Sequence, residues 1–226
     1  MSIIGMQELI PAGRVVVVID VIRAFTTAAI AFERGVTDIA CAPTPEAGRE
    51  LRRRYPERLL AGEIRGLKPA DFDIGNSPYE MSTAPVHGRR LIQTTSNGTR
   101  GLTRCPDPVA LLAASARNVG ATARWIASNH PGTPWTLLCT GRTAEDRACA
   151  EHLDALLRGS VPRAADLVDG IRAGAAELAR SFARRPVSEV VDLSPDLGFC
   201  SEVDRSDFAM VGYIREGHVE LTAVRS

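Results

Sequence analysis

The sequence predicts an α/β protein of three layers (α/β/α), in which helices cover both faces of a mostly parallel sheet and an antiparallel hairpin ends the chain. Strand-like and helix-like segments alternate, as βαβ crossovers require. The run of four valines and an isoleucine at 15–19 is typical of a parallel strand buried on both faces. Two strand-like segments separated by Glu216-Gly217 predict the hairpin.

Each element follows from its local pattern. Gly35 fits the C-terminal end of the first helix. We expect the hairpin, with strands at 207–214 and 218–224, to add antiparallel strands to the sheet. The remaining strands are expected at 14–19, 37–41, 58–61, 89–94, 108–113 and 135–139, and the helices at 24–34, 45–54, 98–103, 118–128, 145–158 and 164–184.

Length and composition restrict the possible functions. No linker divides the 226 residues, so we expect residues 1–226 to form a single domain. The 27 basic and 27 acidic residues cancel, which argues against nucleic-acid binding through bulk charge. No apolar stretch approaches the roughly 20 residues that cross a membrane. The five cysteines form no C-x-x-C pair and no signal peptide is visible, so we expect a cytoplasmic protein with reduced, non-catalytic thiols.

Asp20 and Arg23 lie where the first buried strand gives way to a helix. Open α/β sheets bind their ligands at the carboxyl ends of strands. The guanidinium group of Arg23 brings an anion-binding fork close to the carboxylate of Asp20. This pairing favours a metal-and-phosphate site over an ion pair that only stabilises the fold.

A second polar segment contains Glu63 and, further on, Asn76 and Ser77. Ser77 can cap a helix that begins at Pro78. Capping explains part of this segment, but it does not explain a glutamate at a strand end.

A third segment, Thr95 to Thr99, follows the strand at 89–94. Clustered hydroxyl groups and Gly98 between a strand and a helix can form an anion cradle of backbone N–H groups. The segment is neither a Walker A loop nor a dinucleotide fingerprint. A hairpin turn at Asn97-Gly98 is the alternative, which the parallel alternation around it disfavours.

A fourth segment, Cys139 to Asp146, also follows a strand and contains Arg142. Thr143 and Asp146 resemble a capping box with aspartate in place of glutamate. Local sequence leaves open whether Asp146 caps the helix or takes part in catalysis.

These segments together indicate a metal-assisted enzyme that acts on a small phosphorylated anion. Carboxylates at strand ends, with oxygen-rich loops, suit a hard cation such as Mg²⁺. Arginines and N–H cradles suit a phosphate.

The segments resemble the 2-phosphosulfolactate phosphatase family, and the resemblance covers nearly the whole chain. It implies an α/β/α fold and the Mg²⁺-dependent acid phosphatase activity known from coenzyme M biosynthesis. It also adds Asn118 to the residues expected at the substrate. The matching segments are Ile19–Ala24, Phe72–Pro78, Thr94–Thr99, Ser115 with Asn118, Phe199-Cys200 and Val203–Asp207.

Two residues depart from the family's pattern. Phe25 and Ser96 stand where the family resemblance leads us to expect threonine. The change at Phe25 removes a hydroxyl group near the expected site and bears on the identity of the substrate more than on the type of reaction. We therefore expect 2-phosphosulfolactate or a related 2-phospho-2-hydroxy acid as the substrate.

We assign roles on this basis. Asp20 and Glu63 hold Mg²⁺, and Asp146 serves as general acid or as the base that orients water. Arg23 is expected to act in catalysis, where it and the 95–99 loop neutralise and orient the phosphoryl oxygens. Arg142 or another basic group is expected to pair with the substrate carboxylate or sulfonate. The residues expected to bind substrate and phosphate are Arg23, Asn76, Ser77, Thr95, Asn97, Gly98, Thr99, Asn118 and Arg142.

Alternatives stay open at this level. Asp20 could be a nucleophile that forms an aspartyl-phosphate, although the chain lacks the D-x-D signature of haloacid-dehalogenase phosphatases. A relative that binds anions without hydrolysing them is the rival function, and a homodimer is compatible with the sequence. If the 95–99 loop cradles phosphate, Thr99→Val or Asn97→Ala should lower turnover about a hundredfold and leave stability nearly unchanged.

Overall fold

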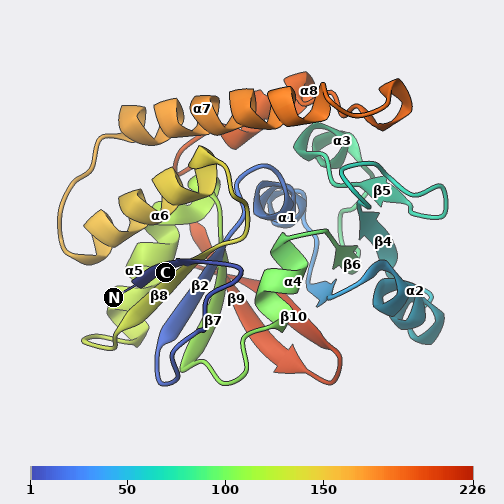
Figure 1. Cartoon of the computed structure of the whole chain (residues 1–226). Coiled ribbons are helices and arrows are strands. Elements are labelled where there is room, and N and C mark those ends of the chain that lie inside the picture. The colour runs from blue at the N-terminus through green and yellow to red at the C-terminus, as the bar shows by residue number, and fades with distance from the viewer. Residues whose placement is uncertain (1, 226) are drawn as a thin grey trace.

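The computed structural model describes residues 2–225 and confirms the α/β class. Its centre is a ten-stranded, mostly parallel sheet with helices on both faces (Figure 1). The strand order is β1-β8-β2-β7-β9-β10-β3-β6-β4-β5. The strands are β1 (Ser2–Gly5), β2 (Val15–Ile19), β3 (Ile39–Ala42), β4 (Leu59–Gly62), β5 (Ile74–Gly75), β6 (Leu91–Thr94), β7 (Ala110–Ala114), β8 (Trp135–Cys139), β9 (Phe208–Arg215) and β10 (His218–Arg225).

The hairpin β9–β10 lies in the middle of this sheet and joins two parallel halves. Strands β1, β8, β2 and β7 form the first half-sheet, and β3, β6, β4 and β5 form the second. Strand β9 is antiparallel to β7, and β10 is antiparallel to both β9 and β3. The predicted hairpin is therefore confirmed, and its central position means that the two half-sheets run in opposite directions.

The twist of the sheet explains how residues from two half-sheets of opposite direction can meet at a single site. Neighbouring strands rotate by roughly 20–25°, so the five steps from β2 to β6 accumulate roughly 100–125°. This rotation turns the carboxyl ends of the second half-sheet toward those of the first. The segments that follow β2 and β6 meet as a result, at Asp20 and Gly98.

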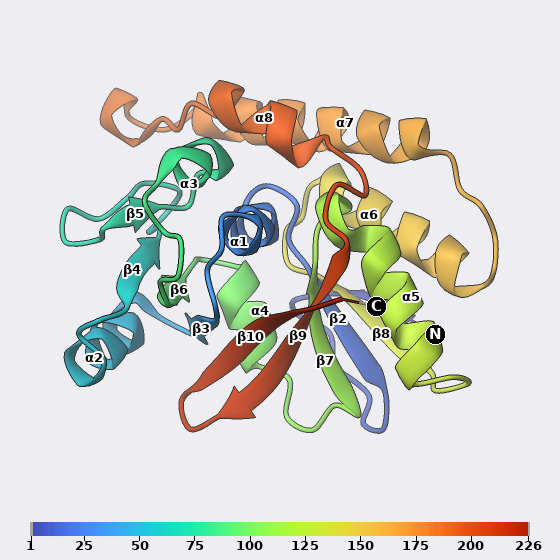
Figure 2. The same ribbon diagram turned by 180° about the vertical axis from the view of Figure 1, so that it is seen from behind.

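The helices form layers on the two faces of the sheet (Figures 1 and 2). Helices α1 and α4 pack on the face that the two half-sheets share, whereas α5 and α6 cover the other face of the first half-sheet and α2 that of the second. Helix α7 packs on α6, and α8 on α3. The helices are α1 (Ala24–Glu33), α2 (Pro45–Arg54), α3 (Pro78–Thr83), α4 (Gly98–Thr103), α5 (Val119–Asn129), α6 (Ala144–Leu157), α7 (Ala164–Phe182) and α8 (Ser194–Cys200), with short 3₁₀ turns at Ala116–Asn118 and Val187–Glu189.

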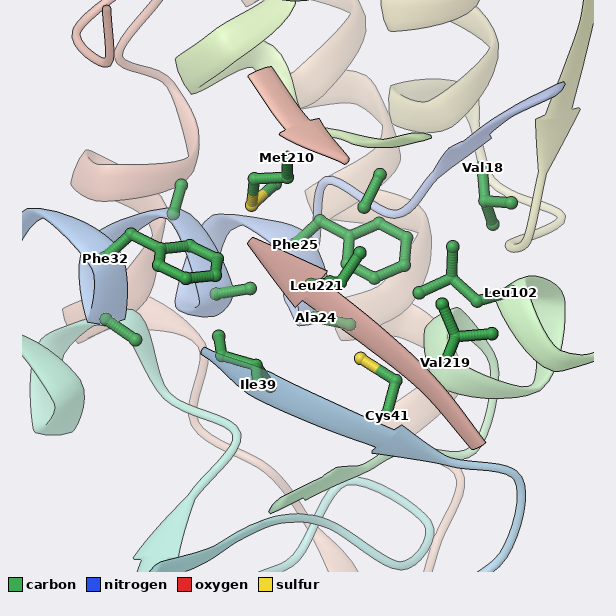
Figure 3. Close-up of a cluster of buried hydrophobic side chains, with 14 of the residues drawn as sticks. Val18, Ala24, Phe25, Phe32, Ile39, Cys41, Leu102, Met210, Val219 and Leu221 are labelled. Atoms are coloured by element: carbon green, nitrogen blue, oxygen red, sulfur yellow. The ribbon is translucent and has the colours of Figure 1, made fainter. Parts of the chain in front are cut away.

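One hydrophobic cluster connects both half-sheets through α1 (Figure 3). Phe25 of α1 is fully buried in it, together with Val18 of β2 and Leu102 of α4. Leu221 of β10 and Cys41 of β3 belong to the same cluster. Phe25, which the sequence singled out as a departure from the family's pattern, is thus a central core side chain.

The predicted elements agree with the structure within about two residues at each end. Gly35 takes a positive φ of 89° directly after α1, as its predicted role requires. The sequence did not predict β1, β5 or α8. Strands β1 and β5 are only four and two residues long, and α8 contains both proline and glycine. Such segments carry too little periodicity to identify.

Two further expectations can be compared with residues 2–225. None of their helices is long and apolar enough to cross a membrane. All five cysteines are free and buried, and burial raises the pKa of Cys105 and Cys139 to about 12. Thiols with such high pKa values are poor nucleophiles, in line with the prediction that none is catalytic.

Candidate functional site

A cavity of about 860 Å³ opens where the ends of β2 and β8 meet the start of α4. Its lining includes four of the residues that the sequence predicted for the site. The loop after β1 and the last turns of α7 complete its wall. The four predicted residues are Asp20, Asn97, Arg142 and Asp146.

Asp20 and Asp146 lie side by side at the base of this cavity, on either side of Thr140. The hydroxyl group of Thr140 donates to Asp20 Oδ2 at 2.8 Å and lies 3.4 Å from Asp146 Oδ2. Asp146 also accepts the backbone N–H groups of Val21 at 2.8 Å and Gly141 at 2.7 Å. Two carboxylates, one from the end of β2 and one from the first turn of α6, are therefore fixed by hydrogen bonds in one polar cluster.

Burial raises the pKa of both carboxyls and of a third, Glu145, which also lines the cavity. For Asp146 the negative charges of Asp20 and Glu145 raise the pKa further. In the described part of the chain, no lysine, arginine or histidine forms an ion pair with any of these three groups. This acidic cluster can therefore hold a proton or attract a cation.

Glu63 has a different environment from these three acids. Its carboxylate accepts the backbone N–H and the hydroxyl of Ser96 and the N–H of Gly66. It is buried but is not among the residues that line the cavity. Through these hydrogen bonds, Glu63 links the loop after β4 to the loop after β6.

Three of the five N–H groups of the 95–99 loop already have acceptors, two of them within the loop itself. The hydroxyl of Thr99 accepts the N–H of Thr95 at 2.9 Å, and Thr95 Oγ1 accepts the N–H of Thr99 at 3.0 Å. The N–H of Ser96 goes to Glu63. Within residues 2–225, the N–H groups of Asn97 and Gly98 have no hydrogen-bond acceptor. Of the predicted anion cradle, only the N–H groups of these two residues are therefore available to bind a phosphate.

Gly98 permits the close approach of the two half-sheets. A Cβ atom at this position would lie 2.9 Å from Asp20 Oδ2 and 2.7 Å from the Cβ atom of Ala24. Any side chain would push the start of α4 away from the start of α1. The structure therefore brings Asp20, Asn97 and Asp146 together in one cavity, whereas Glu63, which was expected to meet them, is not part of its lining.

Arg23, in contrast, does not line the cavity. Its guanidinium donates to Asp196 Oδ2 at 2.8 Å and to the carbonyl of Gly66 at 2.9 Å. Ser77 donates to Asp196 Oδ1 at 2.6 Å and also caps α3 through the N–H of Glu80. The buried Arg23–Asp196 ion pair links the residue before α1 to α8. The partner of Arg23 is therefore Asp196, which the sequence analysis did not consider.

Three other predicted residues also have local partners or lie away from the cavity. Asn118 accepts the N–H of Ser115 at 2.9 Å and donates to the carbonyl of Ala113 at 3.2 Å, which completes the cap of its own turn. Asn76 is buried and, like Thr95, is not part of the lining. The capping box that Thr143 and Asp146 resemble in the sequence does not form, because Thr143 donates to Glu145 and makes no cap hydrogen bond.

Among the cavity residues to which sequence reasoning gave no role are Thr140, Glu145 and Arg100. Arg100 lies three residues after Asn97, one turn along α4, and this spacing could have placed both on one helix face. Arg100 and Arg142 are exposed, and neither forms an ion pair with a carboxylate of the described residues. The cavity therefore has arginines free to bind an anion beside its acidic cluster.

The carboxylates of the acidic cluster can bind Mg²⁺ if water and the substrate phosphate supply the remaining ligands. Among residues 2–225, no three His, Cys, Asp or Glu side chains form a ready-made metal centre. Mg²⁺, however, usually keeps several waters and is bound by one or two carboxylates together with substrate phosphates. Glu145, which lines the same cavity, has one buried carboxylate oxygen, Oε2, without a hydrogen-bond partner among the described residues.

Comparison with known proteins identifies one family. The model of the 2-phosphosulpholactate phosphatase family matches residues 5–213. A protein of Synechocystis named probable 2-phosphosulfolactate phosphatase is 37% identical over 147 residues, which cover 63% of this chain and 61% of the relative. The chain thus spans about three fifths of that relative's length. Relatives of the same name are 32% identical in Gloeobacter violaceus and 29% in Bacillus subtilis, with about nine tenths of each chain covered.

Proposed function

The chain belongs to the 2-phosphosulfolactate phosphatase family, and we propose that it hydrolyses the phosphate monoester of a small 2-hydroxy acid. The products are the hydroxy acid and inorganic phosphate. The observation that carries the proposal is the cavity, in which a buried acidic cluster lies beside arginines without acidic partners. An acidic cluster can bind a cation and move a proton, and the arginines can bind the anions of the substrate.

The substrate class follows from the arginines. Arg100 and Arg142 line the same cavity, so a ligand there can be held by more than one anionic group. A 2-phospho-2-hydroxy acid carries a phosphate and at least one carboxylate or sulfonate. The N–H groups of Asn97 and Gly98 are the backbone donors for the phosphoryl oxygens. 2-Phosphosulfolactate has this chemistry, and with it as substrate the reaction would belong to coenzyme M biosynthesis.

The proposed cofactor is Mg²⁺, with Asp20 as its principal ligand and Asp146 beside it. Bound there, Mg²⁺ would neutralise negative charge on the phosphoryl oxygens. Glu63 stays a predicted second ligand, but its three hydrogen bonds to Ser96 and Gly66 favour a structural role.

Asp146 is the proposed general acid. Burial and the charges of Asp20 and Glu145 raise the pKa of its carboxyl, so that it retains a proton more readily than an exposed aspartate. As water attacks phosphorus, the bond to the 2-oxygen breaks, Asp146 gives its proton to that leaving oxygen, and one proton of the attacking water returns to Asp146. A phosphoryl intermediate on Asp20 is the alternative route. Inversion at a chiral phosphorus supports direct attack by water, and retention supports the intermediate.

Phosphate release tests the proposed function. Purified protein is assayed with 2-phosphosulfolactate, 2-phospholactate and p-nitrophenyl phosphate, each with Mg²⁺ and with a chelator. We expect Mg²⁺-dependent release, fastest with a 2-phospho-2-hydroxy acid. Binding of these compounds without hydrolysis would instead identify an anion-binding relative. Light scattering and cell fractionation test the expected homodimer and cytoplasmic location.

A further inference from the structure

Glu145 is the least satisfied acid of the cavity. It occupies the second position of α6, is only 2% exposed and lines the cavity. Its Oε1 atom accepts the hydroxyl of Thr143 at 2.7 Å. Its Oε2 atom is buried and has no hydrogen-bond partner within the described chain. A buried carboxylate oxygen without a partner is costly unless something supplies positive charge or a donor.

The protein does not supply that positive charge nearby. In the described chain, no ion pair within 4 Å reaches Glu145, Asp20 or Asp146. Two other buried acids form ion pairs, Asp196 with Arg23 at 2.8 Å and Asp38 with Arg58 at 2.8 Å. Glu63 has no ion pair among the described residues, but N–H and hydroxyl donors contact both of its oxygens. Glu145 differs from all three because one of its oxygens has no partner.

Helix α7 holds Glu145 in place. A Cβ atom at Gly174 would lie 2.0 Å from Glu145 Oε2 and 2.7 Å from its backbone nitrogen. One turn earlier, a Cβ atom at Gly170 would lie 2.3 Å from the Cβ atom of Ala148. Both glycines let α7 pack against α6, but only Gly174 touches the carboxylate.

We propose that Glu145, rather than Glu63, is the second acidic residue that binds the divalent cation of this site together with Asp20. Glu63 has N–H and hydroxyl donors for both of its oxygens and does not line the cavity. Glu145 lines the cavity together with Asp20, and one of its carboxylate oxygens has no hydrogen-bond partner among the described residues. Gly174 keeps the Glu145 carboxylate in its position. This inference rests on the proposed Mg²⁺-assisted function.

Calorimetric titration of Mg²⁺ into the full chain tests it without any substrate. We expect Glu145→Gln to weaken Mg²⁺ binding about tenfold or more, the size of effect seen when groups around a metal are removed. Glu63→Gln should change the affinity by less than about threefold and should mainly lower the melting temperature. The opposite ranking of these two variants, equal effects, or no Mg²⁺ binding by the wild type at millimolar concentration would overturn the inference.

A matched pair of glycine variants tests the contact with α7. Gly174→Ala and Gly170→Ala introduce the same methyl group at the same helix interface, and both should lower the melting temperature. Only Gly174→Ala should weaken Mg²⁺ binding. Equal weakening by both variants contradicts the role given to Gly174. If Gly174→Ala fails to fold, the comparison of Glu145→Gln with Glu63→Gln decides alone.

Failure of the proposed function can be told apart from failure of this inference. If the protein binds Mg²⁺ through Glu145 but releases no phosphate from any substrate, the cation site is supported and the phosphatase function is contradicted. A chain that releases phosphate at full rate as Glu145→Gln, with unchanged Mg²⁺ affinity, retains the function and loses the inference.

Discussion

At the scale of single residues, the site separates side chains that face the cavity from side chains that build its walls. Asp20 and Asn97 line the cavity, whereas Arg23, Thr99 and Asn118 are used within the fold. All five belong to polar segments at strand ends, so local sequence does not distinguish them. Substitutions can distinguish them. Replacing a residue that builds the wall should change stability, whereas replacing a residue that faces the cavity should change turnover.

Asp20→Asn should abolish most activity without unfolding the protein. Asparagine keeps the size of the side chain and removes a buried negative charge that no arginine or lysine pairs with. We expect phosphate release to fall about a hundredfold or more, equivalent to roughly 2.7 kcal/mol in the barrier. The melting temperature should not fall. Wild-type turnover in this variant would exclude Asp20 both as a metal ligand and as a nucleophile.

Asn97→Ala should lower turnover, whereas Thr99→Val should lower stability. This revises the expectation from sequence that both variants lower turnover. Thr99 is fully buried, and its hydroxyl is the acceptor for the N–H of Thr95, so Thr99→Val should cost about 1–3 kcal/mol of stability. Asn97 is exposed at the start of α4 and makes no cap hydrogen bond. Asn97→Ala should therefore lower kcat/KM with little change in stability. Urea unfolding and phosphate release on both variants check this contrast, and equal stability losses would contradict it.

At the scale of elements, an ion-pair network attaches the central hairpin to the second half-sheet. Arg58, before β4, bridges Glu220 of β10 at 2.9 Å and Asp38, before β3, at 2.8 Å. Arg90, before β6, pairs with Asp38 at 2.7 Å. Burial alone would raise the pKa of Glu220, but hydrogen bonds involving His218, Asp38 and Arg58 outweigh burial and lower it.

This network predicts a pH-dependent effect of Glu220→Gln. A lowered pKa in the folded state means that the charged carboxylate stabilises the fold above its unfolded pKa, near 4.5, and that this stabilisation is lost as pH falls toward the folded pKa. At pH 7 the variant should lose about 1–3 kcal/mol, because Arg58 is buried and loses a partner. Melting temperatures from pH 3 to pH 7 should show a gap between variant and wild type that narrows below about pH 4.5. A gap that is constant over this range would contradict the prediction.

At the scale of the whole molecule, the two half-sheets share one core. Phe25 on α1 belongs to a cluster that includes Val18 of the first half-sheet, Leu221 of the hairpin and Cys41 of the second half-sheet (Figure 3). Neither half-sheet can bury its inner face without the other and the hairpin. The expected single domain over residues 1–226 therefore leads to a test of cooperativity.

Unfolding should occur in one transition that both half-sheets share. Trp125 of α5 and Trp135 of β8 report on the first half-sheet, and hydrogen exchange of α2 and β4 amides reports on the second. Phe25→Ala should cost about 3–5 kcal/mol and shift both probes equally. Separate midpoints for fluorescence and exchange would show that the halves unfold independently.

The sequence by itself determined the elements and the chemistry of the polar segments. Those properties are local: a buried strand such as 15–19, the glycine after α1 and the cap at Ser77 follow from side-chain periodicity and backbone preference over a few residues. Only the tertiary structure decided that the hairpin joins two half-sheets of opposite direction and that Arg23 forms its ion pair with Asp196. It also decided that Glu145 reaches the cavity whereas Glu63 braces a loop. These outcomes depend on strand order, accumulated twist and competition among donors and acceptors far apart in the chain, and no local pattern encodes which partner a carboxylate or arginine will meet.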